Sequence, residues 1–163
     1  MVSQRELILH KVEWKRNGKK MVFAHGSFDL LHPGHVRLLE QARALGDVLV
    51  VGVRSDAGVR AVHARETDAV NAEPLRPITS ATERAEILAA LAAVDFAVIF
   101  DSPEPDELLA QLQPDIAVEG APDSSAAPAR KNLPGASCST VLIPLEPGYS
   151  TARLIERIQQ LRA

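Results

Sequence analysis

The sequence predicts an α/β fold: a single-domain, Rossmann-like three-layer sandwich with a mostly parallel sheet, over residues 1–163. Three observations lead to this prediction. Short β-branched runs alternate with helical segments, which is the order of a parallel sheet with helical crossovers. Hydrophobic residues make up 46% of the chain but aromatic residues only 4%, a balance that suits helices packed on such a sheet. A chain of 163 residues is also long enough for one domain with a substantial core.

The first half of the chain is expected to contain two helices and two strands. A leading helix is predicted over 3–16, within segment 1–18, because apolar residues there follow a helical spacing before an Asn-Gly pair. The apolar run 20–25 is predicted as the first strand of the core. A helix is predicted over 33–45, where a proline in the first turn and a following glycine suit both ends. The β-branched run 47–53 is typical of a buried parallel strand.

The second half repeats this alternation. Ser80 and Glu83 form a capping box that opens a helix expected over 80–92, and a strand follows over 94–100. Ser102, followed by a proline and an acid, is expected to begin another helix. The remaining predicted elements are strands over 115–118 and 140–144 and an amphipathic helix over 150–161. Segments 64–77 and 119–137 are predicted to be irregular, the second as a mobile loop.

Composition and charge exclude several classes of function. The net charge of -3 argues against a general nucleic-acid binder, which needs clustered Lys and Arg. A single cysteine, Cys138, excludes an internal disulfide and a multi-cysteine zinc site, and it suits a reducing compartment. No apolar run approaches the roughly 20 residues of a membrane span. We therefore expect a cytoplasmic protein without a membrane or nucleic-acid partner.

Residues 22–35 carry the strongest functional signal. An apolar strand ends near Ala24, and a glycine turn at Gly26 leads into a helix that carries His32 and His35. A strand that passes through glycine into a helix N-terminus builds an anion site from unpaired N–H groups and the helix dipole. Residues three apart share a helix face, so both imidazoles should face that point. This pattern predicts chemistry on a nucleoside triphosphate, with Gly34 leaving room for a phosphate.

The ten residues from Gly26 to His35, Gly-Ser-Phe-Asp-Leu-Leu-His-Pro-Gly-His, resemble the signature of the HxGH nucleotidyltransferases, which include the cytidylyltransferases. Further matches follow in the same order, among them Ser55-Asp56, Arg76-Pro77, Glu83-Arg84 and Gly148-Tyr149-Ser150-Thr151. In detail the chain resembles the adenylyltransferase domain of ADP-heptose synthases, from about residue 5 to residue 158. The resemblance therefore covers nearly the whole chain.

The resemblance implies attack of a phosphate oxygen on the α-phosphorus of ATP or CTP, with release of pyrophosphate. His32 and His35 would stabilise charge on the triphosphate, and Gly26 and Ser27 would hold phosphate through the backbone. Asp29 would orient the turn. The other residues implied at the nucleotide or acceptor site are Ala24, His25, Phe28, Gly34, Asp56, Arg84, Glu119, Gly120, Tyr149, Ser150 and Thr151. Mg²⁺ would enter with the phosphates, the acceptor would be a phosphorylated small molecule, and a homodimer is left open.

The sequence departs from these relatives at two places. A lysine expected after the Ser-Asp pair is replaced near His63, and Glu119 stands where relatives carry another lysine. A glutamate would repel a triphosphate, whereas a lysine would attract it. The cations that could substitute are Arg60, Arg65, Arg76, Arg130 and Lys131. Two alternatives stay open: a cytidylyltransferase acting on glycerol phosphate or another polyol phosphate, and a non-catalytic nucleotide-binding module.

Overall fold

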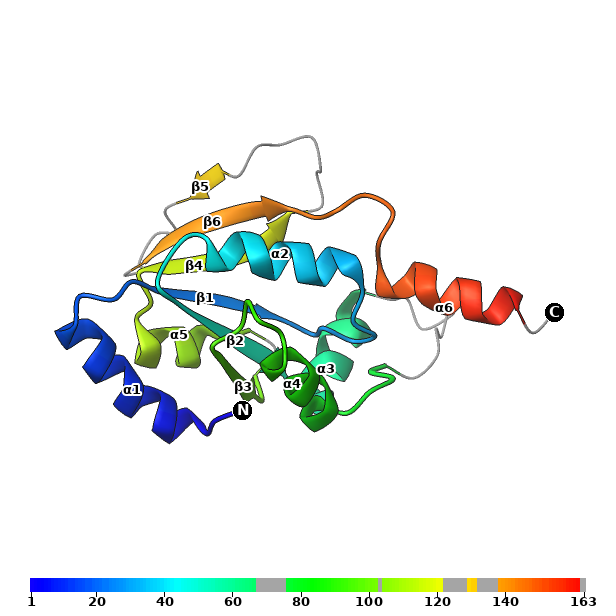
Figure 1. Cartoon of the computed structure of the whole chain (residues 1–163). Helices are drawn as coiled ribbons and strands as arrows, with labels where there is room; N and C mark the ends of the chain where they lie inside the picture. Colours follow the sequence, from blue (N-terminus) through cyan, green and yellow to red (C-terminus); the bar gives the residue numbers. More distant parts are fainter. Residues whose placement is uncertain (67–75, 103, 122–128, 132–137, 162–163) are drawn as a thin grey trace.

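A computed structural model describes residues 1–66, 76–102, 104–121, 129–131 and 138–161, and within them a six-stranded sheet forms the centre (Figure 1). The strand order is β3-β2-β1-β4-β6-β5. The strands are β1 (Met21–Gly26), β2 (Val48–Arg54), β3 (Phe96–Phe100), β4 (Ile116–Ala121), β5 (Ala129–Lys131) and β6 (Ser139–Pro144). All neighbouring pairs are parallel except β5 and β6, which are antiparallel. The carboxyl ends of five strands therefore meet at one edge of the sheet.

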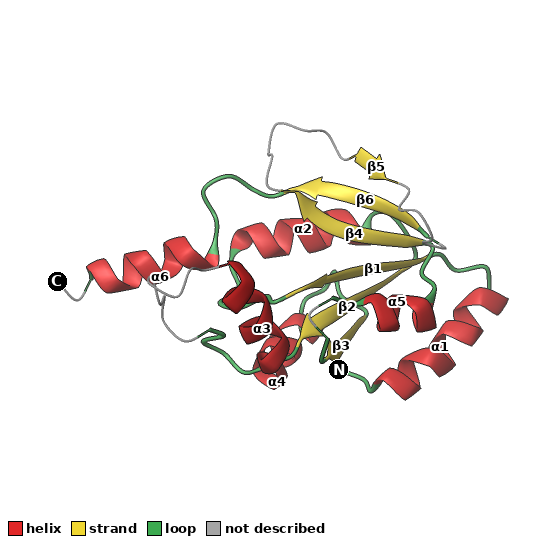
Figure 2. Ribbon diagram, turned by 180° about the vertical axis from the view of Figure 1, so that it is seen from behind, coloured by secondary structure: helices red, strands yellow, loops and turns green. Residues whose placement is uncertain are grey.

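Helices cover both faces of the sheet, which gives the three layers predicted from the sequence (Figures 1 and 2). The helices are α1 (Gln4–Arg16), α2 (Pro33–Arg43), α3 (Asp56–Glu66), α4 (Ala81–Ala89), α5 (Asp106–Leu112) and α6 (Thr151–Gln160). Helices α2 and α4 pack on one face, and α1 and α5 pack on the other. The α/β, Rossmann-like prediction is confirmed.

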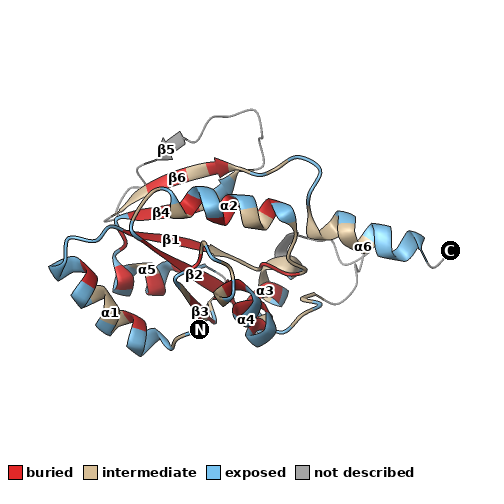
Figure 3. Cartoon of the chain, in the orientation of Figure 1, coloured by how far each residue is buried: buried red, intermediate tan, exposed pale blue. Residues whose placement is uncertain are grey.

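The alternation of side chains along the strands divides the core into two clusters. In β1, Val22 and Ala24 face α2 and α4, whereas Met21 and Phe23 face α1 and α5. Every residue of β2 is buried, as expected for a parallel strand covered on both faces (Figure 3). The core thus holds the ends of β1 and β2 in fixed positions beside the predicted site.

Helix α6 extends away from the rest of the molecule (Figures 1 and 3). None of its residues is buried. Its first turn is closed by Ser150, whose hydroxyl accepts a hydrogen bond from the backbone N–H of Arg153 at 3.2 Å. Ser150 is therefore a helix cap in this structure.

Three sequence predictions about local structure are wrong. Residues 64–66, predicted as irregular, belong to α3, a helix that was not predicted. The helix expected at Ser102 begins instead at Asp106, because the Ser102 hydroxyl donates to the nearby Glu104 carbonyl and caps no helix. The predicted loop 119–137 contains the end of β4 and all of β5, since both pair with β6. The other residues of these two predicted irregular segments lie outside the described ranges, apart from 76 and 77.

Candidate active site

The turn that follows β1 brings the signature residues together. Phe28 and Leu30 have positive φ values of 51° and 48°, a left-handed conformation that costs energy for residues other than glycine. Gly26 does not supply this conformation. A Cβ at Gly26 would lie 3.2 Å from the Phe28 ring, so glycine is needed there for close contact. The turn is held in a strained shape, which requires bonds from its neighbours.

Asp29 supplies several of those bonds. Its carboxylate, 2% exposed, accepts hydrogen bonds from the backbone N–H groups of Ile78 and Thr79 at 2.9 and 3.0 Å. The Thr79 hydroxyl donates to the same carboxylate at 3.0 Å. The backbone carbonyl of Asp29 accepts from the hydroxyl of Thr151, at the start of α6, at 2.7 Å. Asp29 therefore joins the motif turn to two distant segments, as the predicted orienting role requires.

The buried side chain of Arg84 supports the motif through hydrogen bonds to backbone carbonyls. The side chain is 2% exposed, and its Nε donates to the Thr79 carbonyl at 2.9 Å. Nη1 donates to the carbonyls of Ser27 and Arg54. Nη2 forms a salt bridge with Asp56 at 2.6 Å. Arg84 and Asp56 were expected at the ligand, but here Arg84 binds backbone of the motif and Asp56 binds Arg84.

His32 closes the N-terminus of α2. It lies at the N-cap, and its Nδ1 accepts a hydrogen bond from the backbone N–H of His35 at 3.4 Å. That N–H also reaches the carbonyl of His32, and Pro33 has no N–H to offer. A Cβ at Gly34 would lie 3.1 Å from both the His32 ring and the Cβ of Tyr149. A side chain at position 34 would therefore crowd His32 and Tyr149, and contact between Gly34 and a phosphate stays a prediction.

The two signature imidazoles stack on each other. Their ring centroids are 3.7 Å apart and the ring planes differ by 15°. Burial, with a further contribution from repulsion by His32, lowers the pKa of His35 to about 4. Burial also lowers the pKa of His32. Without a ligand, His35 is consequently neutral near pH 7 and offers one N–H donor.

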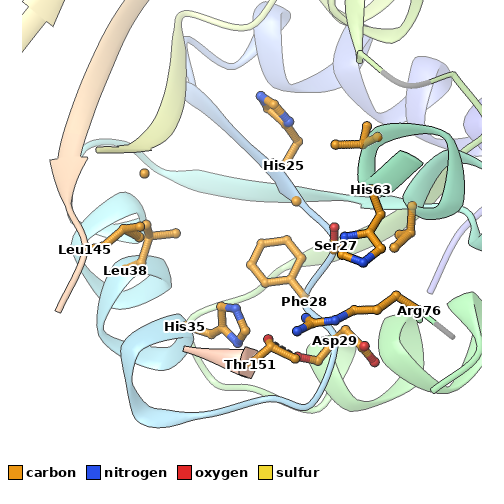
Figure 4. Close-up of a pocket in the computed structure, with 14 residues that line it drawn as sticks. His25, Ser27, Phe28, Asp29, His35, Leu38, His63, Arg76, Leu145 and Thr151 are labelled. Atoms are coloured by element: carbon orange, nitrogen blue, oxygen red, sulfur yellow. Dashed lines mark hydrogen bonds between the residues drawn. The ribbon is translucent and has the colours of Figure 1, made fainter. Parts of the chain in front are cut away.

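A cavity of about 320 Å³ opens beside this pair (Figure 4). Eight predicted site residues line it, namely His25, Gly26, Ser27, Phe28, Asp29, His35, Gly120 and Thr151. They come from β1, the motif turn, the first turn of α2, β4 and the first residue of α6. The cavity lies at the carboxyl ends of the strands, where open α/β sheets place their ligands. Segments that the sequence predicted for the site thus line one cavity, and their contact with a ligand stays a prediction.

Other predicted residues lie around the cavity without lining it. Ala24 is buried in the core, and Ser150 caps α6. The Tyr149 ring lies 6.3 Å from that of His32, and the Arg37 guanidinium lies over it at 5.4 Å. Glu119 precedes Gly120 on β4 and is not among the residues that line the cavity. Their contact with a ligand stays a prediction.

His25 has an unusual environment at the end of β1. Its ring stacks on Phe23 at 6.0 Å and meets the edge of Phe100 at 6.4 Å. Burial, reinforced by the charge of Arg54, lowers the pKa of His25 to about 4. The Nδ1 atoms of His25 and His35 are buried and have no hydrogen-bond partner among the described residues. Both rings are therefore held neutral beside the cavity.

Six lining residues were not predicted as part of the site, namely Leu38, Val59, Val62, His63, Arg76 and Leu145. Three of them belong to α3, the helix that sequence analysis missed. The signal that could have found α3 is Ser55, whose hydroxyl accepts from the backbone N–H of Gly58 at 3.2 Å as a cap does. Leu145 was not predictable locally, because it meets the site only through the packing of β6 against Gly120.

One of the five cations considered as replacements for the missing lysines lines the cavity. It is Arg76, which precedes α4. Arg60 is exposed on α3 and is not among the lining residues. The side chains of Arg65, Arg130 and Lys131 lie outside what the structure describes.

The described residues contain neither a metal-binding cluster nor a membrane-spanning helix. Within them, no group of three or more His, Cys, Asp and Glu side chains is arranged to hold a metal ion. None of the described helices combines the length and apolar character that crossing a membrane requires.

Comparison with known proteins gives a consistent result. Residues 23–133 match the family model described as Cytidylyltransferase-like. The bifunctional protein HldE of Syntrophotalea carbinolica is 45% identical over 88% of this chain and 28% of its own length. HldE of Koribacter versatilis is 39% identical over 96% of this chain and 31% of its length, and HldE of Campylobacter jejuni RM1221 is 43% identical over 89% and 29%. The chain therefore spans less than a third of these curated relatives.

A solved structure gives the same fold. The lipopolysaccharide core biosynthesis protein from Thermoplasma volcanium superposes with a TM-score of 0.53 at 24% identity, covering 88% of this chain and 89% of that one. The family model spans the motif strand, the motif turn and most of the sheet. The family predicted from the sequence is thereby confirmed: the chain belongs to the cytidylyltransferase-like family.

Proposed function

We propose that the chain transfers an adenylyl group from ATP to a sugar 1-phosphate such as heptose 1-phosphate and releases pyrophosphate. The observation that carries this proposal is the stacked His32–His35 pair beside a cavity lined by Gly26, Ser27 and Thr151. The cavity offers backbone, hydroxyl and imidazole groups to a phosphorylated ligand. The matched family and the sequence resemblance support the reaction class.

In this reaction a phosphate oxygen of the acceptor attacks the α-phosphorus of ATP. The bond between the α-phosphorus and the bridging oxygen breaks, and pyrophosphate leaves with that oxygen. Such a displacement needs alignment and charge stabilisation more than a protein nucleophile. His35 would donate a hydrogen bond to the phosphate on which negative charge grows. The rigid turn at Phe28 and Asp29 would hold the phosphates in line.

Mg²⁺ would enter this site with the triphosphate. The carboxylate of Asp29 lines the cavity, but its oxygens already accept hydrogen bonds from Ile78 and Thr79. Phosphate oxygens and water would therefore supply most ligands of the ion, as is usual for Mg²⁺. Its contribution when bound is to neutralise phosphate charge.

The proposal is tested by measuring pyrophosphate release with ATP and CTP against a panel of phosphorylated acceptors, sugar 1-phosphates and glycerol phosphate among them. We expect turnover with ATP and a sugar 1-phosphate. Turnover with CTP and glycerol phosphate would favour a cytidylyltransferase instead. Nucleotide binding without turnover of any pair would identify a binding module and overturn the proposal.

A substitution tests the role of the signature pair. His35→Ala should lower kcat by about 100-fold with little change in KM, since one charge-stabilising donor is removed from the transition state. His10→Ala is the matched control, because His10 lies on α1 against Trp14 and Phe96 and does not line the cavity. An unchanged kcat in His35→Ala would contradict the assigned role.

A further inference from the structure

The wall of the cavity outside the motif is built from two separate segments. Val59, Val62 and His63 line it from α3, and Arg76 lines it from the segment before α4. In Figure 4 the guanidinium end of Arg76 points toward the side of the cavity where His35 and Thr151 lie. The His63 ring lies toward Ser27 in the same view. Two nitrogen-bearing side chains thus face the motif from outside it.

The charges around the cavity show why these two side chains matter. Among the described lining residues Asp29 is the acid, and its carboxylate accepts hydrogen bonds from two backbone N–H groups and a hydroxyl. The pKa of His25 and that of His35 are both lowered to about 4, so neither is charged near pH 7. Among the described lining residues, Arg76 alone has a permanent positive charge. A nucleoside triphosphate carries several negative charges, which the motif residues alone do not balance.

The backbone next to Arg76 is fixed to the motif. Ile78 and Thr79, two and three residues later, donate their N–H groups to Asp29. The Thr79 carbonyl also accepts from Arg84 at 2.9 Å. The side chain of Arg76 therefore extends from backbone that is fixed beside the turn. Its planar guanidinium can donate two parallel hydrogen bonds to one phosphate.

The position of His63 is fixed through α3. The N-terminus of this helix is held by the Ser55 cap and by the salt bridge from Asp56 to the buried Arg84. His63 lies one turn beyond Val59, so both belong to the same face of α3. Val59 is buried against the core, which directs this face inward. His63 is thereby presented to the cavity by an anchored helix.

We infer that Arg76 and His63 bind the triphosphate of the nucleotide, and that Arg76 supplies positive charge that the motif lacks. This inference deepens the proposed function and rests on it. The contact is with phosphate rather than base or sugar, because the guanidinium of Arg76 lines the cavity and phosphate is the negatively charged part of a nucleotide. Arg76 faces the side of His35 and His63 faces Ser27, so the triphosphate lies between these two side chains and the motif (Figure 4).

Affinities for ATP, ADP and AMP, measured by calorimetry, test the inference. Arg76→Ala should weaken ATP binding by about tenfold or more, because a hydrogen bond between charged groups is lost. The loss should become smaller from ATP to ADP to AMP. His63→Ala should weaken ATP binding less than Arg76→Ala, and His63→Lys should restore it. Arg60→Ala is the charge-matched control on the exposed face of α3 and should change affinity by less than about twofold.

The outcomes separate this inference from the proposed function. Equal losses for ATP and AMP in Arg76→Ala, or no loss in a variant whose melting temperature is unchanged, would overturn the triphosphate contact. A wild-type chain that binds ATP with the expected variant pattern but releases no pyrophosphate would overturn the proposed function alone. A wild-type chain that binds neither ATP nor CTP would overturn both.

Discussion

Arg84 shows how one buried side chain determines the shape of a site that it does not line. Its guanidinium joins the carbonyls of Ser27, Arg54 and Thr79 to the carboxylate of Asp56. These partners come from three segments, because Arg54 and Asp56 are only two residues apart. A buried guanidinium can serve them together because its donors are fixed in one plane. Arg84 is thus a positioning residue for the motif and for α3.

Replacing Arg84 with lysine should separate charge from geometry. Arg84→Lys keeps the positive charge but cannot reach all four acceptors, so we expect a loss of about 2–4 kcal/mol in the free energy of unfolding. The value of kcat/KM for pyrophosphate release should fall with it. Asp56→Asn keeps an acceptor oxygen and should cost less on both measures. Urea unfolding at neutral pH measures the first effect, and wild-type stability in Arg84→Lys would contradict it.

At the scale of elements, α3 and the first residue of α6 both contribute to the wall of the cavity. Helix α3 is held at its start by Ser55 and Asp56, and α6 is held at its start by Thr151. Since no residue of α6 is buried, tertiary packing adds little to the stability of this ten-residue helix. The hydrogen bond from Thr151 to the Asp29 carbonyl is therefore a principal attachment of α6 to the motif.

Thr151→Val removes that bond while keeping the side-chain shape. We expect amide hydrogen exchange across 151–160 to become faster, because the first turn of α6 is released from the motif. The free energy of unfolding of the whole chain should fall by only about 1 kcal/mol. Thr151→Ser retains the hydroxyl and is the matched control. Exchange that is equally slow in Thr151→Val and in the wild type would show that other contacts hold α6.

At the scale of the whole molecule, the fold accommodates two imidazoles in neutral form. The pKa values of His25 and His35 are both lowered to about 4, chiefly by burial. Between pH 6.5 and pH 4 the unfolded chain binds more protons than the folded chain at these positions. Stability is therefore highest above pH 6.5, falls as the pH drops, and loses no more from these groups below about pH 4.

His25→Asn should reduce this sensitivity to acid. Each histidine contributes about 2 kcal/mol to the difference in unfolding free energy between pH 7.5 and pH 4.5, after allowance for partial solvent contact. The asparagine variant should thus lose about 2 kcal/mol less than the wild type over that interval. Urea unfolding at both pH values measures the effect. Parallel losses in the two proteins would show that His25 is charged in the folded state.

The sequence allowed the sheet and most of the site to be predicted, because those features depend on residues that lie close together in the sequence. β-branched runs identify β1 and β2, and the signature places His35 and Asp29 at the end of β1. Helix α3 escaped prediction because it contains Gly58 and its apolar residues are only alanine and valine. The structural role of Arg84 was not predictable, since it depends on three segments that only folding brings together.

The stacking of His32 on His35 has a consequence for how much charge the signature can carry. With ring centroids 3.7 Å apart, a proton on one imidazole lowers the proton affinity of the other. The two rings therefore titrate as a coupled unit, with two macroscopic steps that belong to the pair rather than to either residue. A bound anion favours the first protonation step, while the second must also overcome the repulsion between two imidazoliums. In the pH range where only the first protonation step is complete, the two histidines together carry one positive charge.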